Sequence, residues 1–262
     1  MTTEKHADGT ILISLENNIL RLTFNRPEKK NALTHAMYDA MIEALERTEK
    51  DAAVRALCFC GTEGCFTSGN DLKDFLGNPP SGGESPVMRF LHALIDMKKP
   101  LVAAVQGPAI SIGATMLLHC DMVFASPDAS FQMPFTKLAL CPEAGSSYLL
   151  RQVVGTTRAL SMLLSSQTID ANTATQWGLV SEIIPGMLFE NTVADRLASL
   201  AALPPEAVRV AKALVREPMQ AAAHDAVNRE AGEFIKRLMS EEAGEAMQAF
   251  LERRAPDFSR FE

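Results

Sequence analysis

The sequence lacks a long hydrophobic run, an excess of positive charge and a regular spacing of cysteines. Its 262 residues include 25 Lys and Arg against 32 Asp and Glu, which gives a net charge of −7. Because phosphate binding requires a basic surface, this balance argues against nucleic acid as the main partner. No apolar segment is long enough to span a bilayer, and residues 1–10 are polar, unlike a signal peptide. The sequence therefore predicts a cytoplasmic protein that binds neither nucleic acid nor membranes.

The five cysteines are an odd number and contain no CxxC pair. This usage fits reduced thiols in a core better than disulfides or a zinc site, so we expect no metal centre. Cys58 and Cys60 alternate with Phe59 on a predicted strand and would share its buried face. With 47% hydrophobic and 22% charged residues, the chain is otherwise typical of a globular protein with one sizeable core.

Residues 55–74 predict a buried strand, a turn of small residues and the start of a helix. Ser68 and Gly69 have little bulk, so a ligand could approach the backbone closely. The N–H groups at a helix start have no partner inside the helix, and such a turn can hold an oxyanion. The alternative is an ordinary strand-to-helix turn in which Asn70 or Asp71 is the N-cap.

The same unit occurs a second time in residues 101–118. An unbroken apolar strand at 101–105 leads into a turn at 106–115 that contains Gly107 and Gly113, and a short helix follows. Two such turns side by side could direct two N–H groups at one oxygen. Stabilisation of a thioester enolate or a tetrahedral oxyanion requires this arrangement.

The rest of the chain predicts a mixed α/β protein that becomes all-helical after about residue 190. Asn17 and Asn18 tolerate the positive φ of a tight hairpin, and residues 77–86 form a Gly/Pro-rich loop, either a lid or a simple flexible connection. The predicted strands are 11–15, 19–24, 55–60, 101–105, 122–125 and 179–184. The predicted helices are 34–50, 71–76, 85–97, 146–154, 157–164, 170–177, 189–202, 205–215, 219–239 and 241–254.

Taken together, the sequence resembles the crotonase, or enoyl-CoA hydratase/isomerase, superfamily. The motifs that carry the resemblance follow one another along nearly the whole chain: Asn25-Arg26-Pro27, Asn31-Ala32-Leu33, residues 66–74, Val105-Gln106-Gly107-Pro108-Ala109, Cys120-Asp121, Trp177-Gly178-Leu179-Val180 and residues 250–254. The resemblance implies a spiral of ββα units with an acyl-CoA site in residues 1–195. It implies a helical oligomerisation region in residues 196–262, and a homotrimer or hexamer. Coenzyme A would be part of the substrate, and no separate cofactor is implied.

The resemblance also assigns site residues. The backbone N–H groups of Asn70 and Ile112 would be the two oxyanion-hole donors. Residues that would bind the CoA moiety are Arg26 and Lys29, near its pantetheine or phosphate end, and Ser68, Gly69, Asp71, Leu72 and Lys73 along the CoA-binding loop. By residue type alone, the two lysines are more often solvated surface residues than ligands.

The chain departs from the pattern of hydratases, which use two glutamates to activate water and protonate the α-carbon. Thr115 and Phe135 occupy those two positions, and neither side chain can perform acid–base catalysis. A single glutamate, Glu143, lies in the later loop, as in the Δ3,Δ2-enoyl-CoA isomerases of the peroxisomal type. Glu143 would move the proton from C2 to C4 of a 3-enoyl-CoA. We expect apolar neighbours, Leu140 and Leu149 together with Phe135, to raise its pKa.

Other functions remain open. Hydration or thioester hydrolysis would use the same oxyanion hole with a different acid–base group. A non-catalytic acyl-CoA-binding oligomer, or an oligomer without a ligand, would keep the fold without turnover. Cys141 and His119 are expected to be packed side chains and not catalytic groups.

Overall fold

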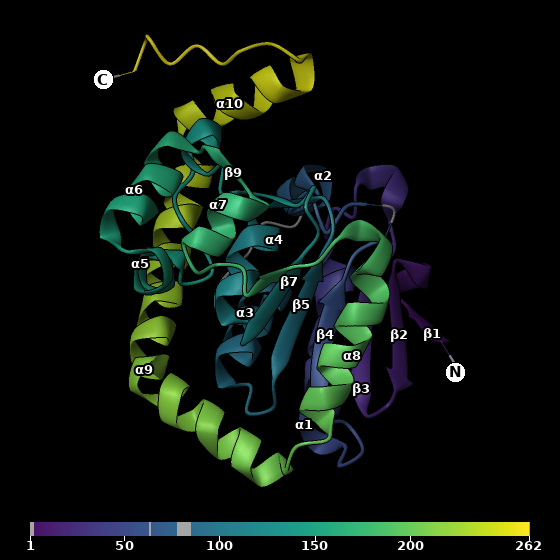
Figure 1. The fold of residues 1–262 in the computed structure, drawn as a ribbon. Coiled ribbons are helices and arrows are strands. Elements are labelled where there is room, and N and C mark those ends of the chain that lie inside the picture. The colour runs from purple at the N-terminus through teal and green to yellow at the C-terminus, as the bar shows by residue number, and fades with distance from the viewer. Residues whose placement is uncertain (1–2, 63, 78–84, 262) are drawn as a thin grey trace.

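A twisted seven-stranded sheet forms the centre of the molecule (Figure 1). The computed structural model describes residues 3–62, 64–77 and 85–261. The strand order is β1-β2-β3-β4-β5-β7-β10; β1, β2 and β3 pair antiparallel, and the pairs from β3 to β10 are parallel. The strands are β1 (Thr3–His6), β2 (Ile11–Glu16), β3 (Ile19–Phe24), β4 (Ala56–Cys60), β5 (Leu101–Val105), β7 (Met122–Ala125) and β10 (Glu182–Ile183). The predicted α/β fold is confirmed.

A second, three-stranded sheet lies beyond the carboxyl ends of the central strands. Its order is β6-β8-β9, with β6 (Pro108–Ile110), β8 (Ser130–Gln132) and β9 (Thr168–Asp170). Because β6 follows β5 after only two residues, the turn between them lies where the two sheets meet.

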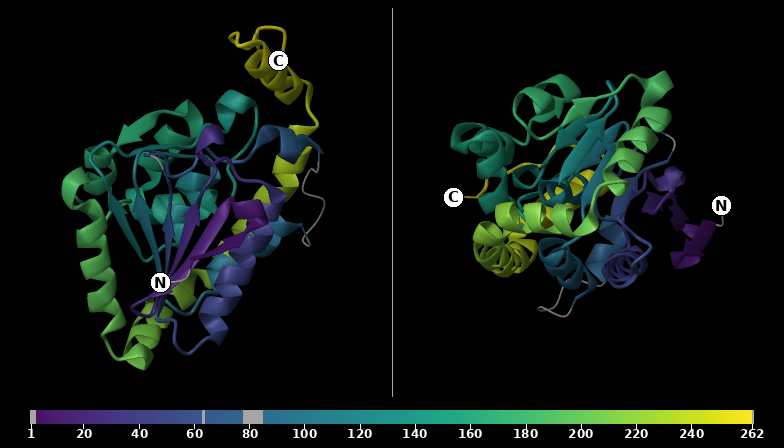
Figure 2. Two further views of the ribbon diagram at one scale, coloured as in Figure 1. Left: turned by 90° about the vertical axis from the view of Figure 1, so that its right-hand side faces the viewer. Right: turned by 60° about the horizontal axis from the view of Figure 1, so that its bottom comes forward.

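The helices cover both faces of the central sheet. The helices are α1 (His35–Lys50), α2 (Leu72–Gly77), α3 (Pro86–Asp96), α4 (Ile112–Thr115), α5 (Ser146–Val154), α6 (Thr156–Ser165), α7 (Ala171–Gln176), α8 (Phe189–Ala201), α9 (Pro205–Leu238) and α10 (Glu241–Glu252). Short 3₁₀ turns are η1 (Ala7–Gly9), η2 (Pro27–Lys29), η3 (Met116–His119), η4 (Thr136–Leu138) and η5 (Gly186–Leu188). In the left view of Figure 2, α1 and α8 lie on opposite sides of the sheet.

Side chains along each central strand alternate between the two faces of the sheet, so a separate hydrophobic core forms on each face. On β4, Leu57 and Phe59 pack with α1 and α3, whereas Cys58 and Cys60 pack with α8 on the other face. The predicted shared face of the two cysteines is confirmed, and their sulfur atoms lie 3.7 Å apart. Both faces of the strand are therefore apolar, as expected for a parallel sheet with helices on each side.

Local signals in the sequence correctly predict one hairpin turn and two helix N-caps. Asn17 and Asn18 adopt φ values of 49° and 64° in the β2–β3 hairpin. The N-caps also form as expected: Thr34 accepts from the N–H of Met37 at the start of α1, and Ser85 accepts from Met88 at the start of α3. Short-range hydrogen bonding determines these features, which is why the sequence alone predicts them.

Three predicted elements, one strand and two helices, differ from the structure. The strand expected at 179–184 is reduced to β10, because the N–H groups of Leu179 and Val180 bond to the carbonyl of Ala174 and close a turn after α7. The two helices expected at 205–215 and 219–239 are a single helix, α9, that continues through Pro218. Pro costs about 3 kcal/mol inside a helix. Burial of side chains farther along α9 offsets this cost, as do the hydrogen bonds from the Arg216 guanidinium to the carbonyl oxygens of residues 118–120.

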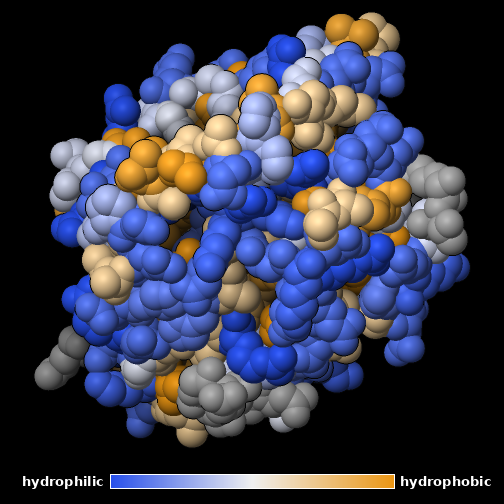
Figure 3. All heavy atoms as spheres, turned by 90° about the horizontal axis from the view of Figure 1, so that it is seen from below, coloured by the Kyte–Doolittle hydropathy of each residue, from blue (hydrophilic) through white to orange (hydrophobic). Residues whose placement is uncertain are grey.

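The C-terminal part of the described chain is helical, with no strand after Ile183 in residues 184–261. Residue 195, the predicted domain boundary, lies inside α8, and the division into two domains stays a prediction. Large apolar side chains are exposed on α9 and α10: Leu214, Val215, Phe250 and Leu251. Seen from below, the surface is mostly polar with small separate apolar groups (Figure 3).

Two further predictions concern the Gly/Pro-rich loop and the absence of a membrane-spanning segment. The Gly/Pro-rich loop lies largely in residues 78–84, which are outside the described residues. Among the described helices, none has the length and apolar content needed to cross a membrane.

Candidate active site

The two predicted turns lie side by side. Thr67, in the first turn, accepts a hydrogen bond from the N–H of Ile110, in the second, at 3.0 Å. Two glycines make this approach possible. A Cβ on Gly69 would lie 2.9 Å from the Cβ of Ser111, and a Cβ on Gly113 would lie 2.5 Å from a methyl group of Thr67. The close packing of the two turns therefore requires glycine at both positions.

The N–H groups proposed as oxyanion donors are available at this junction. Neither the Asn70 N–H nor the Ile112 N–H donates a hydrogen bond to another group in the described residues. Ile112 is the first residue of α4 and follows Ser111, whose φ of 56° and ψ of −123° are strained for a residue with a side chain. Asn70 is fixed through its own side chain, which accepts from the hydroxyl of Tyr38 at 2.6 Å. Asp71, and not Asn70, caps α2.

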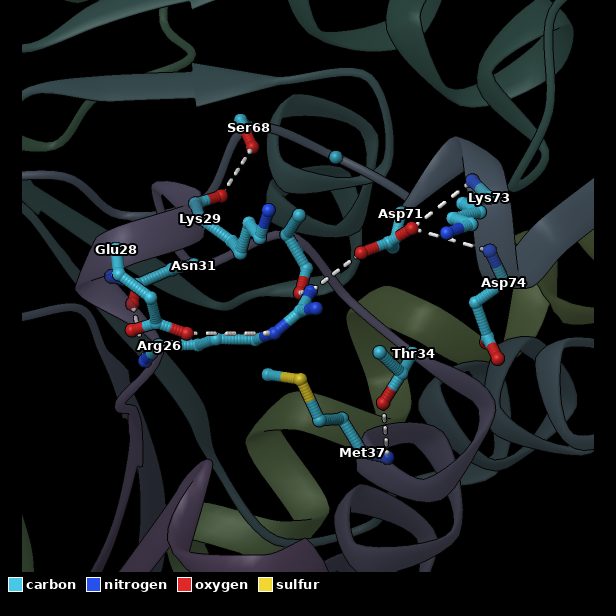
Figure 4. A network of polar contacts seen from close by, with 12 residues as sticks. Arg26, Glu28, Lys29, Asn31, Thr34, Met37, Ser68, Asp71, Lys73 and Asp74 are labelled. Atoms are coloured by element: carbon cyan, nitrogen blue, oxygen red, sulfur yellow. Dashed lines mark hydrogen bonds and ion pairs between the residues drawn. The ribbon is translucent and has the colours of Figure 1, made fainter.

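Most residues of the predicted CoA-binding set gather near the start of α2 (Figure 4). Arg26 forms an ion pair of 2.7 Å with Asp71, and the hydroxyl of Ser68 reaches the carbonyl of Lys29 at 3.4 Å. Burial alone would raise the pKa of Asp71, but the Arg26 guanidinium and the N–H groups of α2 hold it below its usual range. Asp71 also accepts from the N–H of Lys73, whose side chain is exposed. Binding of CoA by these residues stays a prediction.

Glu143 lies in the loop before α5, beside Thr115. The hydroxyl of Thr115 donates to Oε1 of Glu143 at 2.7 Å, and Oε2 has no hydrogen-bond partner among the described residues. Burial raises the pKa of Glu143 to about 7; the hydrogen bond from Thr115 opposes this shift, and the nearby negative charge of Glu230 adds to it. A carboxyl group with this pKa can both accept and release a proton near neutral pH.

Glu143 and Asn70 both line a cavity of about 250 Å³. Its apolar walls come from three helices: Phe75 on α2; Val87, Met88 and Leu91 on α3; and Val227, Ala231, Phe234 and Ile235 on α9. Phe135, Leu140 and Leu149, the expected apolar neighbours of Glu143, are buried in the main core and do not line this cavity. The expected rise in the pKa of Glu143 is present, and the contribution of these three residues to it stays a prediction. The sequence predicted helices over most of α3 and α9 but gave no sign that these helices share a cavity.

His119 and Cys141 behave as packed side chains. His119 is buried, its Nε2 lies 2.8 Å from the carbonyl oxygen of Ala144, and burial lowers its pKa to about 4. It is therefore neutral near pH 7 and donates to that carbonyl. Burial raises the pKa of Cys141 to about 11, so the sulfur is a thiol and not a nucleophilic thiolate.

Sequence reasoning missed Glu230, a buried carboxylate on the wall of the cavity. It lies on α9, 85 residues from the Gly145 N–H that it binds at 2.6 Å, and it also accepts from Ser147 at 2.8 Å. A glutamate in the middle of a long helix carries no local sign of such contacts, since charged residues on helices are usually solvated.

The sheet order, the paired turns and a carboxyl group on the wall of the adjoining cavity define a crotonase-type α/β protein. The family model described as enoyl-CoA hydratase/isomerase matches residues 14–260. The chain belongs to the enoyl-CoA hydratase/isomerase family.

Individual relatives are similar over most of this chain. Peroxisomal enoyl-CoA delta isomerase 3 of Mus musculus is 37% identical, covering 94% of this chain and 79% of the relative. Enoyl-CoA delta isomerase 2 of Rattus norvegicus is 38% identical over 93% of this chain, which spans 64% of that relative. The 2,3-dehydroadipyl-CoA hydratase of Escherichia coli K12 is 31% identical, covering 95% of this chain and 98% of the hydratase. The crystal structure of an enoyl-CoA hydratase/isomerase from Pseudoalteromonas atlantica T6c matches with a TM-score of 0.91 and 40% identity, over 95% and 99% of the two chains.

Proposed function

We propose that this protein is a Δ3,Δ2-enoyl-CoA isomerase in which Glu143 is the single acid–base group. The observation that carries this proposal is a carboxyl group with a pKa of about 7 on the wall of an apolar cavity that Asn70 also lines. The similarity to two mammalian enoyl-CoA delta isomerases supports it.

The proposed reaction is a 1,3-shift of one proton. Glu143 removes a proton from C2 of a 3-enoyl-CoA, and the negative charge spreads onto the thioester oxygen. The N–H groups of Asn70 and Ile112 donate to this oxygen, each contributing about 3 kcal/mol to stabilisation of the enolate. Glu143 then returns the proton at C4. One carboxyl group is sufficient because no water is added.

The substrate would enter with its CoA moiety at the start of α2 and its acyl chain in the cavity. Arg26, Lys29, Ser68, Gly69, Asp71, Leu72 and Lys73 form the proposed CoA-binding surface. In this arrangement Asp71 neutralises Arg26, so Lys29 and Lys73 supply the free positive charges for phosphate. We also propose a cytoplasmic trimer or hexamer, without a cofactor other than the CoA of the substrate.

Hydration is the second candidate, because the E. coli relative is a hydratase and a second carboxylate, Glu230, lines the cavity. One experiment distinguishes the candidates. The purified protein is incubated separately with a 3-enoyl-CoA, a 2-enoyl-CoA and a saturated acyl-CoA, and the products are identified by mass spectrometry and chromatography. Isomerisation moves the double bond without a mass change, hydration adds one water, and thioester hydrolysis releases free CoA. Binding without any product would indicate an acyl-CoA-binding oligomer and would contradict the proposed reaction.

A further inference from the structure

Glu230 uses both carboxylate oxygens to hold the loop that carries Glu143. Oε2 accepts from the N–H of Gly145 and Oε1 accepts from the N–H of Ser147, at 2.6 and 2.8 Å. The side chain is buried, so water does not replace either contact. Burial raises the pKa of Glu230, whereas the hydrogen bonds from Ser147 and Gly145 oppose this shift by stabilising the ionised form.

The loop needs such support because its backbone is strained. Directly after Glu143, Ala144 has a φ of 60° and Gly145 a φ of 73°, so two consecutive residues are left-handed. This conformation is costly for alanine and persists only where surrounding contacts impose it. The peptide group between Ala144 and Gly145 is held at both ends: His119 donates to its carbonyl oxygen, and Glu230 accepts from its N–H.

We propose that Glu230 is a positioning residue, which fixes the Ala144–Gly145 peptide and thereby the direction in which the Glu143 carboxyl group faces the acyl cavity. This inference depends on the proposed role of Glu143 as the base. Glu230 also lines the cavity, but both of its oxygens are occupied by N–H donors. It is therefore placed to orient the loop and not to exchange a proton with the substrate.

The charge of Glu230 has a second effect on Glu143. Burial is the largest cause of the raised pKa of Glu143, and the negative charge of Glu230 raises it further. Other titratable groups near this pair are Tyr38 on α1, His119 on η3 and Cys141 in the same loop as Glu143, and the charged Arg229 lies next to Glu230 on α9. Removal of the Glu230 charge should lower the pKa of Glu143, an effect that a purely structural residue would not produce.

The test compares Glu230→Gln, Glu230→Asp and Glu233→Gln with the wild type. Each is assayed for isomerisation of a 3-enoyl-CoA across roughly pH 5 to 9, and thermal melting confirms that each is folded. In Glu230→Gln we expect kcat to fall roughly tenfold and the acidic limb of kcat/KM to move to lower pH. Glu230→Asp keeps the charge but is one methylene too short to reach both N–H groups, so kcat falls while the limb moves less. Glu233→Gln makes the same change in charge at an exposed position of α9, paired with Lys236, and should resemble the wild type.

Wild-type kcat and an unchanged pH profile in folded Glu230→Gln would overturn the inference. So would a complete loss of turnover matching Glu143→Gln, because Glu230 would then exchange protons itself. If Glu230→Gln does not fold, a folded Glu230→Asp with wild-type kcat overturns it equally. Failure of the proposed function has a different signature: Glu143→Gln would retain normal turnover, whatever the Glu230 variants do.

Discussion

The hydroxyl group of Thr115 donates a hydrogen bond of 2.7 Å to the carboxyl group of Glu143, 28 residues farther along the chain. Thr115, which the resemblance places at the position of a hydratase glutamate, thus contacts the carboxyl group on which the proposed isomerisation depends. This contact occupies Oε1 and leaves Oε2 for the substrate.

Replacement of Thr115 with Val should shift the pH dependence of the reaction. The Thr115 hydrogen bond lowers the pKa of Glu143, so its loss raises that pKa further above the usual value. Because the base must be ionised, the acidic limb of kcat/KM should move to higher pH and the rate at pH 6 should fall. Thr175→Val, which removes a comparable hydroxyl from α7, is the matched control. If the acidic limb of kcat/KM lies at the same pH in Thr115→Val and in the wild type, the hydrogen bond from Thr115 to Glu143 is absent during the reaction.

Replacement of Glu143 with Gln should abolish isomerisation and spare binding. General acid–base groups contribute about 10²–10⁴-fold to rate, and glutamine cannot accept the C2 proton. The amide keeps the size of the side chain, so the cavity and the two N–H donors remain. Turnover of a 3-enoyl-CoA and calorimetric binding of a saturated acyl-CoA are the two measurements. Normal turnover by this variant is incompatible with the proposed mechanism.

The same variant should be more stable than the wild type at alkaline pH. Glu143 has a folded-state pKa of about 7 against a usual value of 4.5, so the native state binds the proton more tightly than the unfolded state. The free energy of unfolding should therefore fall as the pH rises from 4.5 to 7, by up to about 3 kcal/mol. Glu143→Gln avoids this loss. Its melting temperature should match the wild type near pH 4 and exceed it at pH 8. Equal melting temperatures at both pH values would show that Glu143 titrates normally.

Replacement of Gly69 with Ala should damage the junction of the two turns. Gly69 has a φ of 96°, and an added Cβ would lie 3.1 Å from the carbonyl oxygen of Ile110 as well as against Ser111. We expect a loss of about 1–3 kcal/mol in stability and at least about a tenfold loss in kcat, because the Asn70 N–H would be displaced. Gly244→Ala is the control, since a Cβ at that position on α10 meets open space and should stabilise the helix. A Gly69→Ala protein with wild-type kcat and stability would rule out this close approach.

The two turns of the site could be predicted because each is formed by residues that are close together in the sequence. The turn at residues 65–74 joins a buried strand to a capped helix within a few residues, and the repeat of this unit at 106–115 suggested a partner for it. Close packing of the two turns, through Gly69 and Gly113, is what the structure then adds. Short-range rules such as hairpin turns and N-caps act independently of the rest of the fold, so their residues carry the information themselves.

The walls of the cavity could not be predicted in this way. Val227, Glu230 and Phe234 lie on a helix more than 80 residues after Glu143, where the sequence predicted two separate helices. Packing partners that lie far apart in the sequence leave no local pattern, so nothing in this segment shows which part of the chain it covers.

The sequence by itself determined the α/β class, the two glycine-containing turns and the all-helical end, because residue type and spacing decide backbone conformation locally. Glu143 became the acid–base candidate only through the resemblance of the sequence to the isomerases. Only the tertiary structure decided that Thr115 binds Glu143, that α3 and α9 enclose the cavity, and that Glu230 holds the Ala144–Gly145 peptide. Burial, the hydrogen bond from Thr115 and the negative charge of Glu230 set the pKa of Glu143, and all three depend on how segments far apart in the sequence pack together.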